Sequence, residues 1–287
     1  MQEFDFIRAS SLEEAGQLLT EPGSRLIAGG TDVLPQLQRG QFTCQRLIDI
    51  SDLDELRFIR QQDGWIEVGA LISFADLMDS PYLQRTAPSV LEAAATVGCP
   101  QTRNRGTLGG NIANASPAGD TLPPLLSCEG RVHILREGER VVVPLKDFFT
   151  GPGQTVLAPE DVLCSVSFRP LGGGEEALFL KLGNRKGMNI AVASVALRLH
   201  FSPPGKIQKA WVAVGSVAPT PIRSYRTEEV LRGAEANEET LTMAAKALKQ
   251  DIQPIDDVRA SAQRRRESTA ALLKRGLRKL FERRIPS

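Results

Sequence analysis

Two short glycine-rich runs, nearly eighty positions apart, carry the residue types best suited to binding a phosphorylated ligand. The first is Ala28-Gly29-Gly30-Thr31-Asp32 and the second is Thr107-Leu108-Gly109-Gly110-Asn111. Paired glycines let the backbone approach a ligand closely because no Cβ intervenes, and the adjacent Thr, Asp and Asn side chains add hydrogen-bonding groups. The sequence therefore predicts that backbone N–H groups of both runs face one ligand that carries two phosphates.

The second run continues as a longer segment, residues 107 to 120, in which small residues alternate with hydrogen-bonding ones. Such a segment has too little bulk to fill a core. Its Thr, Asn and Ser side chains can donate to phosphate or ribityl oxygens, and Asp120 can accept from hydroxyls. The first run is less specific, because it lacks both the Gly-x-Gly-x-x-Gly dinucleotide fingerprint and a Walker A sequence. A tight turn is the alternative for the first run, and a structural loop is the alternative for the second.

Composition excludes several other classes of function. The 287 residues carry a net charge of +1, so no global field favours nucleic acid or a membrane as the main partner. The four cysteines are far apart and form no C-x-x-C pair, and His133 and His200 have no ligand partner nearby. Neither a metal site nor an iron-sulfur cluster is expected. The acidic N-terminus and the lack of a long apolar run predict a cytoplasmic protein without membrane insertion.

Short strands are expected to position the first run. Residues 25 to 28 are expected to form a strand that leads directly into the glycines, and residues 46 to 50 are expected to form a second strand. Ser11 and Glu14 form a capping box for a helix that ends at Pro22-Gly23.

Around the second run the pattern predicts a hairpin about Asp63-Gly64, between residues 56–60 and 65–69. Further elements expected in this region are short helices beginning at 73 and spanning 88–97 and 123–126, a hairpin of 132–135 with 141–143, and a strand at 162–168.

The last third of the chain changes character after residues 169 to 176, which are rich in glycine and polar residues. Long strands are expected at 190–201 and 207–218, and only helices follow. This pattern predicts an α+β class with a C-terminal β-meander backed by helices. The basic segment 259 to 284 is interpreted as the solvated face of a helix whose apolar stripe packs inward, or as a subunit contact, rather than as a nucleic-acid site.

Four segments in order resemble the FAD-binding medium subunit of the molybdenum hydroxylases, the family of xanthine dehydrogenase and the aerobic carbon monoxide dehydrogenases. They are residues 25–35, 107–120, 150–155 and 181–191. The resemblance covers essentially the whole chain. It implies a two-subdomain FAD-binding fold of the PCMH type, at residues 1–55 and 56–175, followed by a C-terminal α+β domain at residues 176–287.

The resemblance also implies a set of cofactor-binding residues. By motif position, the pyrophosphate and ribityl shell comprises Leu26, Ile27, Ala28, Gly29, Gly30, Thr31, Asp32, Val33, Leu34, Thr107, Gly109, Gly110, Asn111, Asn114 and Asp120. Leu163 and Lys181 match family positions beside the flavin ring. Lys181 would place a positive charge where reduction leaves negative charge at N1 and the C2 carbonyl. The alternative for Lys181 is a strand-end lysine in solvent.

The implied function is electron transfer by noncovalent FAD. In this family the electrons come from [2Fe-2S] clusters of a small partner subunit, after oxidation of the substrate at molybdopterin in a large subunit, and leave to NAD+ or another acceptor. No catalytic acid or base is expected in this chain. Two alternatives stay open: a free-standing FAD-dependent oxidase, and a non-redox assembly module with the same fold.

Overall fold

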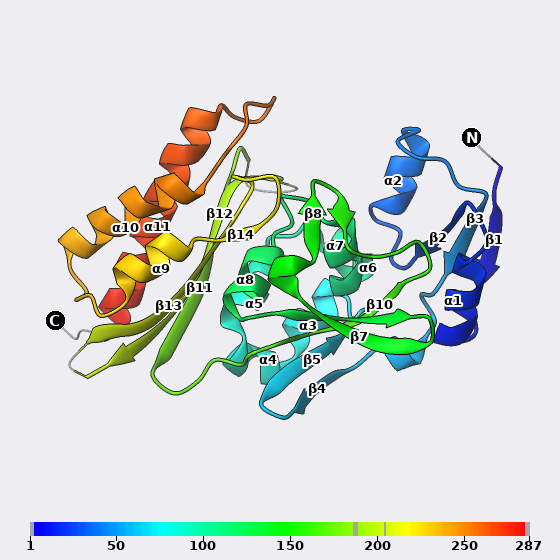
Figure 1. Ribbon diagram of the computed structural model, residues 1–287, viewed down its shortest axis with the longest axis horizontal. Helices are drawn as coiled ribbons and strands as arrows, with labels where there is room; N and C mark the ends of the chain where they lie inside the picture. The colour runs from blue at the N-terminus through cyan, green and yellow to red at the C-terminus, as the bar shows by residue number, and fades with distance from the viewer. Residues whose placement is uncertain (1–2, 186–188, 204, 285–287) are drawn as a thin grey trace.

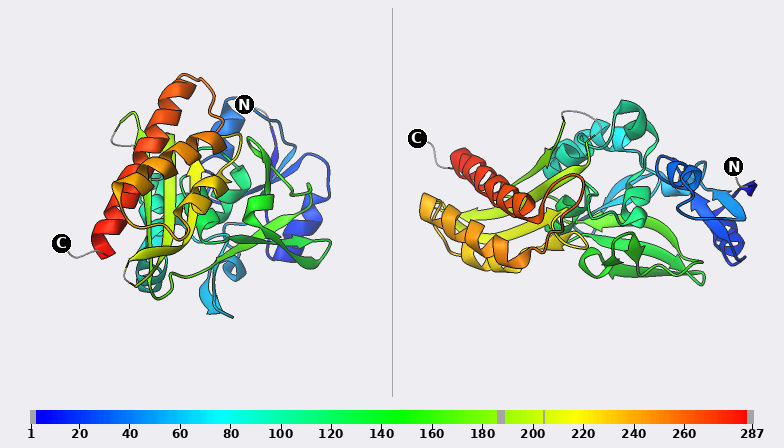
Figure 2. Two further views of the ribbon diagram at one scale, coloured as in Figure 1. Left: turned by 60° about the vertical axis from the view of Figure 1, so that its left-hand side comes forward. Right: turned by 90° about the horizontal axis from the view of Figure 1, so that it is seen from above.

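The computed structural model describes residues 3–185, 189–203 and 205–284, so part of the 181–191 motif lies outside the described residues. Figures 1 and 2 show three layered units along the long axis, with the N-terminal unit at one end and the C-terminal helices at the other. Each unit has its own sheet. The α+β class and the order of the units agree with the sequence prediction.

The first unit is a small parallel sheet in the order β1-β3-β2, which leaves β2 at an edge. Its strands are β1 (Asp5–Arg8), β2 (Ser24–Ile27) and β3 (Arg46–Asp49), and its helices are α1 (Leu12–Leu19) and α2 (Val33–Gln38). The Ser11 cap is confirmed, because the Ser11 side chain accepts from the Glu14 N–H at the start of α1. The Glu14 carboxylate, however, accepts from the N–H and Oγ of Ser10 and not from the Ser11 N–H, so the predicted box is only half formed. Strand β1 was not predicted. Its four residues have no apolar alternation to mark them.

The second unit is a five-stranded sheet in the order β4-β5-β10-β6-β7. Its strands are β4 (Ile59–Gln62), β5 (Trp65–Gly69), β6 (Arg131–Arg136), β7 (Glu139–Pro144) and β10 (Val162–Phe168). The helices that belong to it are α3 (Phe74–Asp79), α4 (Pro81–Thr86), α5 (Pro88–Ala94), α6 (Pro100–Arg105), α7 (Leu108–Asn114) and α8 (Leu122–Ser127). A two-stranded ribbon, β8 (Phe149–Gly151) with β9 (Gln154–Thr155), and two short 3-10 helices, η1 (Asp54–Leu56) and η2 (Leu145–Asp147), complete it. The largest apolar core lies between this sheet and its helices.

The third unit is an antiparallel meander in the order β11-β12-β13-β14. Its strands are β11 (Glu175–Gly183), β12 (Ala191–Ser202), β13 (Lys206–Gly215) and β14 (Ile222–Arg223), and its helices are α9 (Tyr225–Leu231), α10 (Glu238–Asp251) and α11 (Ala262–Arg284). These helices cover one face of the sheet, and α5 and α8 of the second unit lie near it on the other side (Figure 1). The second and third units therefore share a packed boundary.

One buried charge ties the C-terminal helix to this sheet. Arg265 is fully buried and donates hydrogen bonds to the carbonyls of Val192 and Ser216 at 2.7 and 3.0 Å, and to Asp257 Oδ1 at 2.7 Å. The rest of α11 presents an apolar stripe inward, including Leu273 and Leu277, as the sequence predicted. Within the described ranges, no helix is both long and apolar enough to cross a membrane.

Candidate functional site

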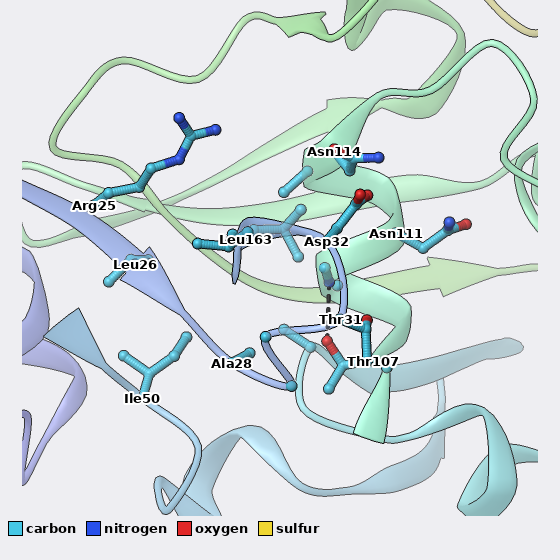
Figure 3. A pocket seen from close by; sticks show the side chains of 18 of the residues that line it. Arg25, Leu26, Ala28, Thr31, Asp32, Ile50, Thr107, Asn111, Asn114 and Leu163 are labelled. Carbon is cyan, nitrogen blue, oxygen red and sulfur yellow. Dashed lines mark hydrogen bonds between the residues drawn. The ribbon is translucent and has the colours of Figure 1, made fainter. Parts of the chain in front are cut away.

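The two glycine-rich runs line one cavity. The first run connects β2 to α2, and the second run is the N-cap and first turn of α7, so the cavity lies between the first and second units (Figure 3). Its volume is about 640 Å³, within the range of ligand pockets in proteins. Leu26, Ile50 and Leu163 give part of it an apolar wall, whereas the runs supply polar groups.

The first run presents a row of free backbone donors. Gly30 has φ +70°, a left-handed conformation that glycine adopts without strain. Within the described residues, the N–H groups of Gly29, Gly30, Thr31 and Asp32 make no hydrogen bond. Successive free N–H groups in a loop of this kind form a concavity that binds anions. The first run therefore has the features of an anion-binding loop.

The first run is pressed against the second unit at one point. A Cβ placed on Gly29 would lie 1.8 Å from the carbonyl oxygen of Arg105, at the end of α6. No side chain fits there, because backbone meets backbone. Gly29 therefore allows the two units to pack closely, and Gly30 allows the left-handed turn.

The second run does not donate its N–H groups in the predicted way. Leu108 N–H donates to Ile72 O, Gly109 N–H to Ala70 O, Gly110 N–H to Thr107 Oγ1, and Asn111 N–H to Thr107 O. The prediction that the backbone N–H groups of both runs face phosphates is therefore wrong for the second run. For Leu108 and Gly109 the sequence could not reveal this, because their acceptors at 70 and 72 come from a distant segment. For Gly110 and Asn111 the acceptor is the nearby Thr107, which is the N-cap of α7.

The two glycines of the second run have different roles. A Cβ on Gly109 would lie 2.6 Å from Ala70 Cβ, so Gly109 lets α7 pack on the segment after β5. Gly110 is exposed, lines the cavity, and would bring a Cβ near only Thr107 Oγ1, at 3.0 Å. Gly110 therefore keeps space open on the cavity side of α7.

The side chains of the second segment supply the donors that its backbone does not. Asn111 Oδ1 accepts from Thr121 Oγ1 at 2.7 Å, and Asn114 Oδ1 accepts from Gln36 Nε2 at 3.1 Å. Each amide oxygen is thus engaged, which leaves the amide NH2 groups as donors at the cavity. The bond from Gln36 also joins α2 to α7, across the boundary between the two units.

Most of the predicted site residues line the cavity. These are Leu26, Ala28, Gly29, Gly30, Thr31, Asp32, Val33, Thr107, Gly109, Gly110, Asn111, Asn114 and Leu163. Four others lie outside its lining. Ile27 is buried in the core of the first unit, Leu34 is 41% exposed, and Asp120 and Lys181 pair with each other.

Lys181 and Asp120 form a buried ion pair. Lys181 Nζ lies 2.5 Å from Asp120 Oδ2 and also donates to the Thr96 carbonyl at 3.1 Å. Both side chains are less than a tenth exposed, so the alternative of a lysine in solvent is wrong. Burial raises the pKa of Asp120 to about 6, although the Lys181 ammonium acts in the opposite direction. Asp120 Oδ1 is buried and has no hydrogen-bond partner among the described residues.

Sequence reasoning missed Arg25 and Gln36, which also line the cavity. Arg25 lies within the 25–35 motif and Gln36 directly follows it, so their positions could have identified them as site residues. Thr121 was missed for a different reason. Its contact with Asn111 spans ten residues and depends on the turn between α7 and α8.

The cavity holds few groups that could perform acid or base catalysis. Arg25, Asp32 and Asp161 are its charged residues, and Asp161 is bound by Arg136 at 2.6 Å. His133 lies elsewhere, on β6, 2.8 Å from Ser167 Oγ. Among the described residues, no group of three His, Cys, Asp or Glu could hold a metal ion. The arrangement is suited to binding a ligand rich in acceptor groups.

Two family models match the chain in sequence. Residues 2–170 match the FAD binding domain in molybdopterin dehydrogenase, and residues 179–280 match the CO dehydrogenase flavoprotein C-terminal domain. The chain belongs to the FAD-binding subunits of the molybdopterin dehydrogenases. This FAD subunit is 33% identical to the putative xanthine dehydrogenase FAD-binding subunit of Escherichia coli K12, over 90% of each chain.

Further relatives are similar to this FAD subunit along nearly its whole length. It is 32% identical to the carbon monoxide dehydrogenase medium chain of Hydrogenophaga pseudoflava, over 96% of each chain. A solved carbon monoxide dehydrogenase from that organism superimposes with a TM-score of 0.95 at 30% identity, covering 99% of each chain. Quinoline 2-oxidoreductase from Pseudomonas putida 86 gives a TM-score of 0.92 at 27% identity.

The residues of the cavity fit FAD, the cofactor of this family. The free N–H groups of the first run suit a pyrophosphate, and the amide donors of Asn111 and Asn114 suit phosphate or ribityl oxygens. Because Gly110 has no Cβ, a ligand can approach the backbone of α7 closely at this point.

Proposed function

We propose that this chain is the electron-transfer medium subunit of a molybdenum hydroxylase. The observation that carries the proposal is the cavity in which four free N–H groups of the first run meet the amide donors of the second segment. When bound, FAD would supply the redox chemistry for electron transfer between [2Fe-2S] clusters of a partner subunit and NAD+ or another acceptor. The chain's own residues hold, orient and electrostatically tune that cofactor.

The two halves of the cavity have separate tasks. We assign the pyrophosphate to the loop from Gly29 to Asp32, because its donors make no other bonds. Asn111 and Asn114, oriented by Thr121 and Gln36, donate to oxygens along the same ligand. These contacts are all hydrogen bonds and need no covalent attachment. We therefore propose that FAD binds noncovalently.

Partner subunits follow from the names of the relatives. Several are called medium chains, which implies a larger and a smaller chain in their complexes. We propose the same for this chain: a large subunit with molybdopterin and a small one with [2Fe-2S] clusters. Its four free cysteines suit a reducing, cytoplasmic setting. We retain residues 1–55, 56–175 and 176–287 as the proposed domains.

The absorbance spectrum of the purified chain tests the proposal directly. A bound flavin that dithionite reduces supports electron transfer. A colourless chain that takes up no added FAD would favour the assembly module. Reduction of the flavin by substrate, without any partner, would favour the free-standing oxidase.

Lys181 is proposed to tune the cofactor rather than to hold it. It is a buried cation anchored by Asp120 and Thr96, close to the second segment in the fold. A fixed positive charge near the flavin stabilises the reduced form, which is the more negative one. Asp120 limits this effect by adding an opposite charge.

Lys181→Met should therefore lower the flavin midpoint potential more than it lowers FAD affinity. The shift should be on the order of 30 mV, which corresponds to a tenfold change in the relative stability of the two redox states for a two-electron couple. Potentiometric titration measures it. The titration should be run at about pH 8.5, because losing Lys181 raises the pKa of the buried Asp120 and its protonation would mask the lost charge.

Asp120→Asn is the matched control for this prediction. It removes the negative member of the same pair and should shift the potential upward. An unchanged potential in both variants, at full FAD occupancy, would show that the pair is structural only.

A further inference from the structure

Arg25 is the only Lys or Arg among the described residues that line the cavity. It lies on β2, the edge strand of the first sheet, immediately before the segment that leads into the first run. Figure 3 shows its side chain leaving the strand and extending toward the side of the cavity that Asn114 lines. The guanidinium thus faces the same space as the phosphate-binding donors.

The Arg25 guanidinium is held in place without being neutralised. Its carbon lies 4.0 Å from the centre of the Phe42 ring, a cation–π contact. With the other residues that the structure describes, the guanidinium makes no hydrogen bond and no ion pair. Phe42 therefore fixes the position of the Arg25 guanidinium. The N–H groups of that guanidinium are left to bind a ligand.

Apart from Arg25, the charged residues that line the cavity are acidic. Asp32 is exposed at the first run, and its carboxylate adds negative charge where a pyrophosphate would bind. Asp161 has its own counter-ion in Arg136. Backbone N–H groups supply dipoles but no net charge. Without Arg25, two phosphate charges would meet a cavity whose one unpaired formal charge is negative.

We propose that Arg25, positioned by Phe42, is the counter-ion for the diphosphate of the bound dinucleotide and sets the affinity of its ADP half. This proposal rests on FAD as the ligand. Stacking of the guanidinium on the adenine base would be a different role, because it depends on the planar shape of the group rather than on its charge. The two roles predict different responses to lysine and to adenosine.

The test compares the full-length apo chain with its Arg25→Gln and Arg25→Lys variants in calorimetric titrations of FAD, ADP and adenosine. Loss of the charge in Arg25→Gln should weaken FAD and ADP binding by about tenfold, and that difference should shrink at high salt. Arg25→Lys should stay within about threefold of wild type, because it keeps the charge. Adenosine, which has no phosphate, should bind all three proteins alike.

Two results would overturn the role of Arg25 while leaving FAD binding intact. One is Arg25→Gln with wild-type affinity for FAD and ADP. The other is Arg25→Lys as weak as Arg25→Gln, with adenosine weakened equally, which would show base stacking instead. Failure of the wild-type chain to bind FAD at all would instead count against the proposed function.

Discussion

Replacing Gly110 by valine should weaken FAD binding roughly a hundredfold while leaving the chain folded. Gly110 lines the cavity, and around its Cβ position only Thr107 Oγ1 lies within 4 Å. The valine methyl groups would therefore occupy space on the ligand side of α7. A steric conflict of about 3 kcal/mol corresponds to roughly a hundredfold loss of affinity. Fluorescence titration with FAD and a far-UV circular dichroism spectrum measure the two effects separately.

A graded series makes this result specific to the site. Gly110→Ala adds one methyl group and should weaken FAD binding by a smaller factor. Gly173→Val is the matched control, because nothing lies within 4 Å of a Cβ there and Gly173 is outside the cavity lining. Wild-type flavin stoichiometry in a folded Gly110→Val protein would remove the second run from the binding site.

Gly29→Ala, unlike Gly110→Val, should mainly destabilise the folded chain. Its Cβ would lie 1.8 Å from the Arg105 carbonyl oxygen, so a backbone segment must move. Moving a packed backbone costs more than displacing a flexible side chain, and we expect a loss of about 3 kcal/mol or more in the free energy of unfolding. FAD binding should fall as well, because the free N–H groups of the first run shift with Gly29.

Urea unfolding of the apo chain measures the stability change of Gly29→Ala. Gly173→Ala again serves as the control and should unfold like wild type. If Gly29→Ala also unfolded at the wild-type urea concentration and bound FAD normally, the close contact between the first run and α6 would be unimportant for the site.

Much of the fold was predictable because local patterns agreed with it. The Asp63-Gly64 turn and the Ser11 cap are short-range features whose structure depends on adjacent residues, and both occur as expected. Strand β1 depends on pairing with β3, more than thirty-five residues away, and could not be recognised from four residues alone. The boundary segment expected at 169–176 also ends early, because β11 begins at Glu175 to pair with β12, and this strand was not predicted.

The site was predictable in its residues but less so in its chemistry. The two glycine pairs line one cavity as expected, yet their N–H groups behave differently. In the second run, Leu108 and Gly109 donate to Ile72 and Ala70, which only tertiary packing decides, whereas Gly110 and Asn111 donate to Thr107 at the start of their own helix. Lys181 was placed near the flavin by resemblance alone. Its burial against Asp120 depends on a contact across 61 residues that no local pattern encodes.

The central claim is that this FAD subunit receives electrons only through partner subunits. Its described residues include no cluster of three His, Cys, Asp or Glu that could hold a metal ion, and its cavity lining contains no histidine or cysteine. The most direct test is anaerobic spectroscopy of the purified, FAD-loaded chain, followed by reconstitution with molybdenum and iron-sulfur subunits. We expect dithionite to bleach the flavin, purines or aldehydes to leave it oxidised, and substrate to reduce it only after reconstitution. Substrate-dependent bleaching in the isolated, metal-free chain would contradict the account.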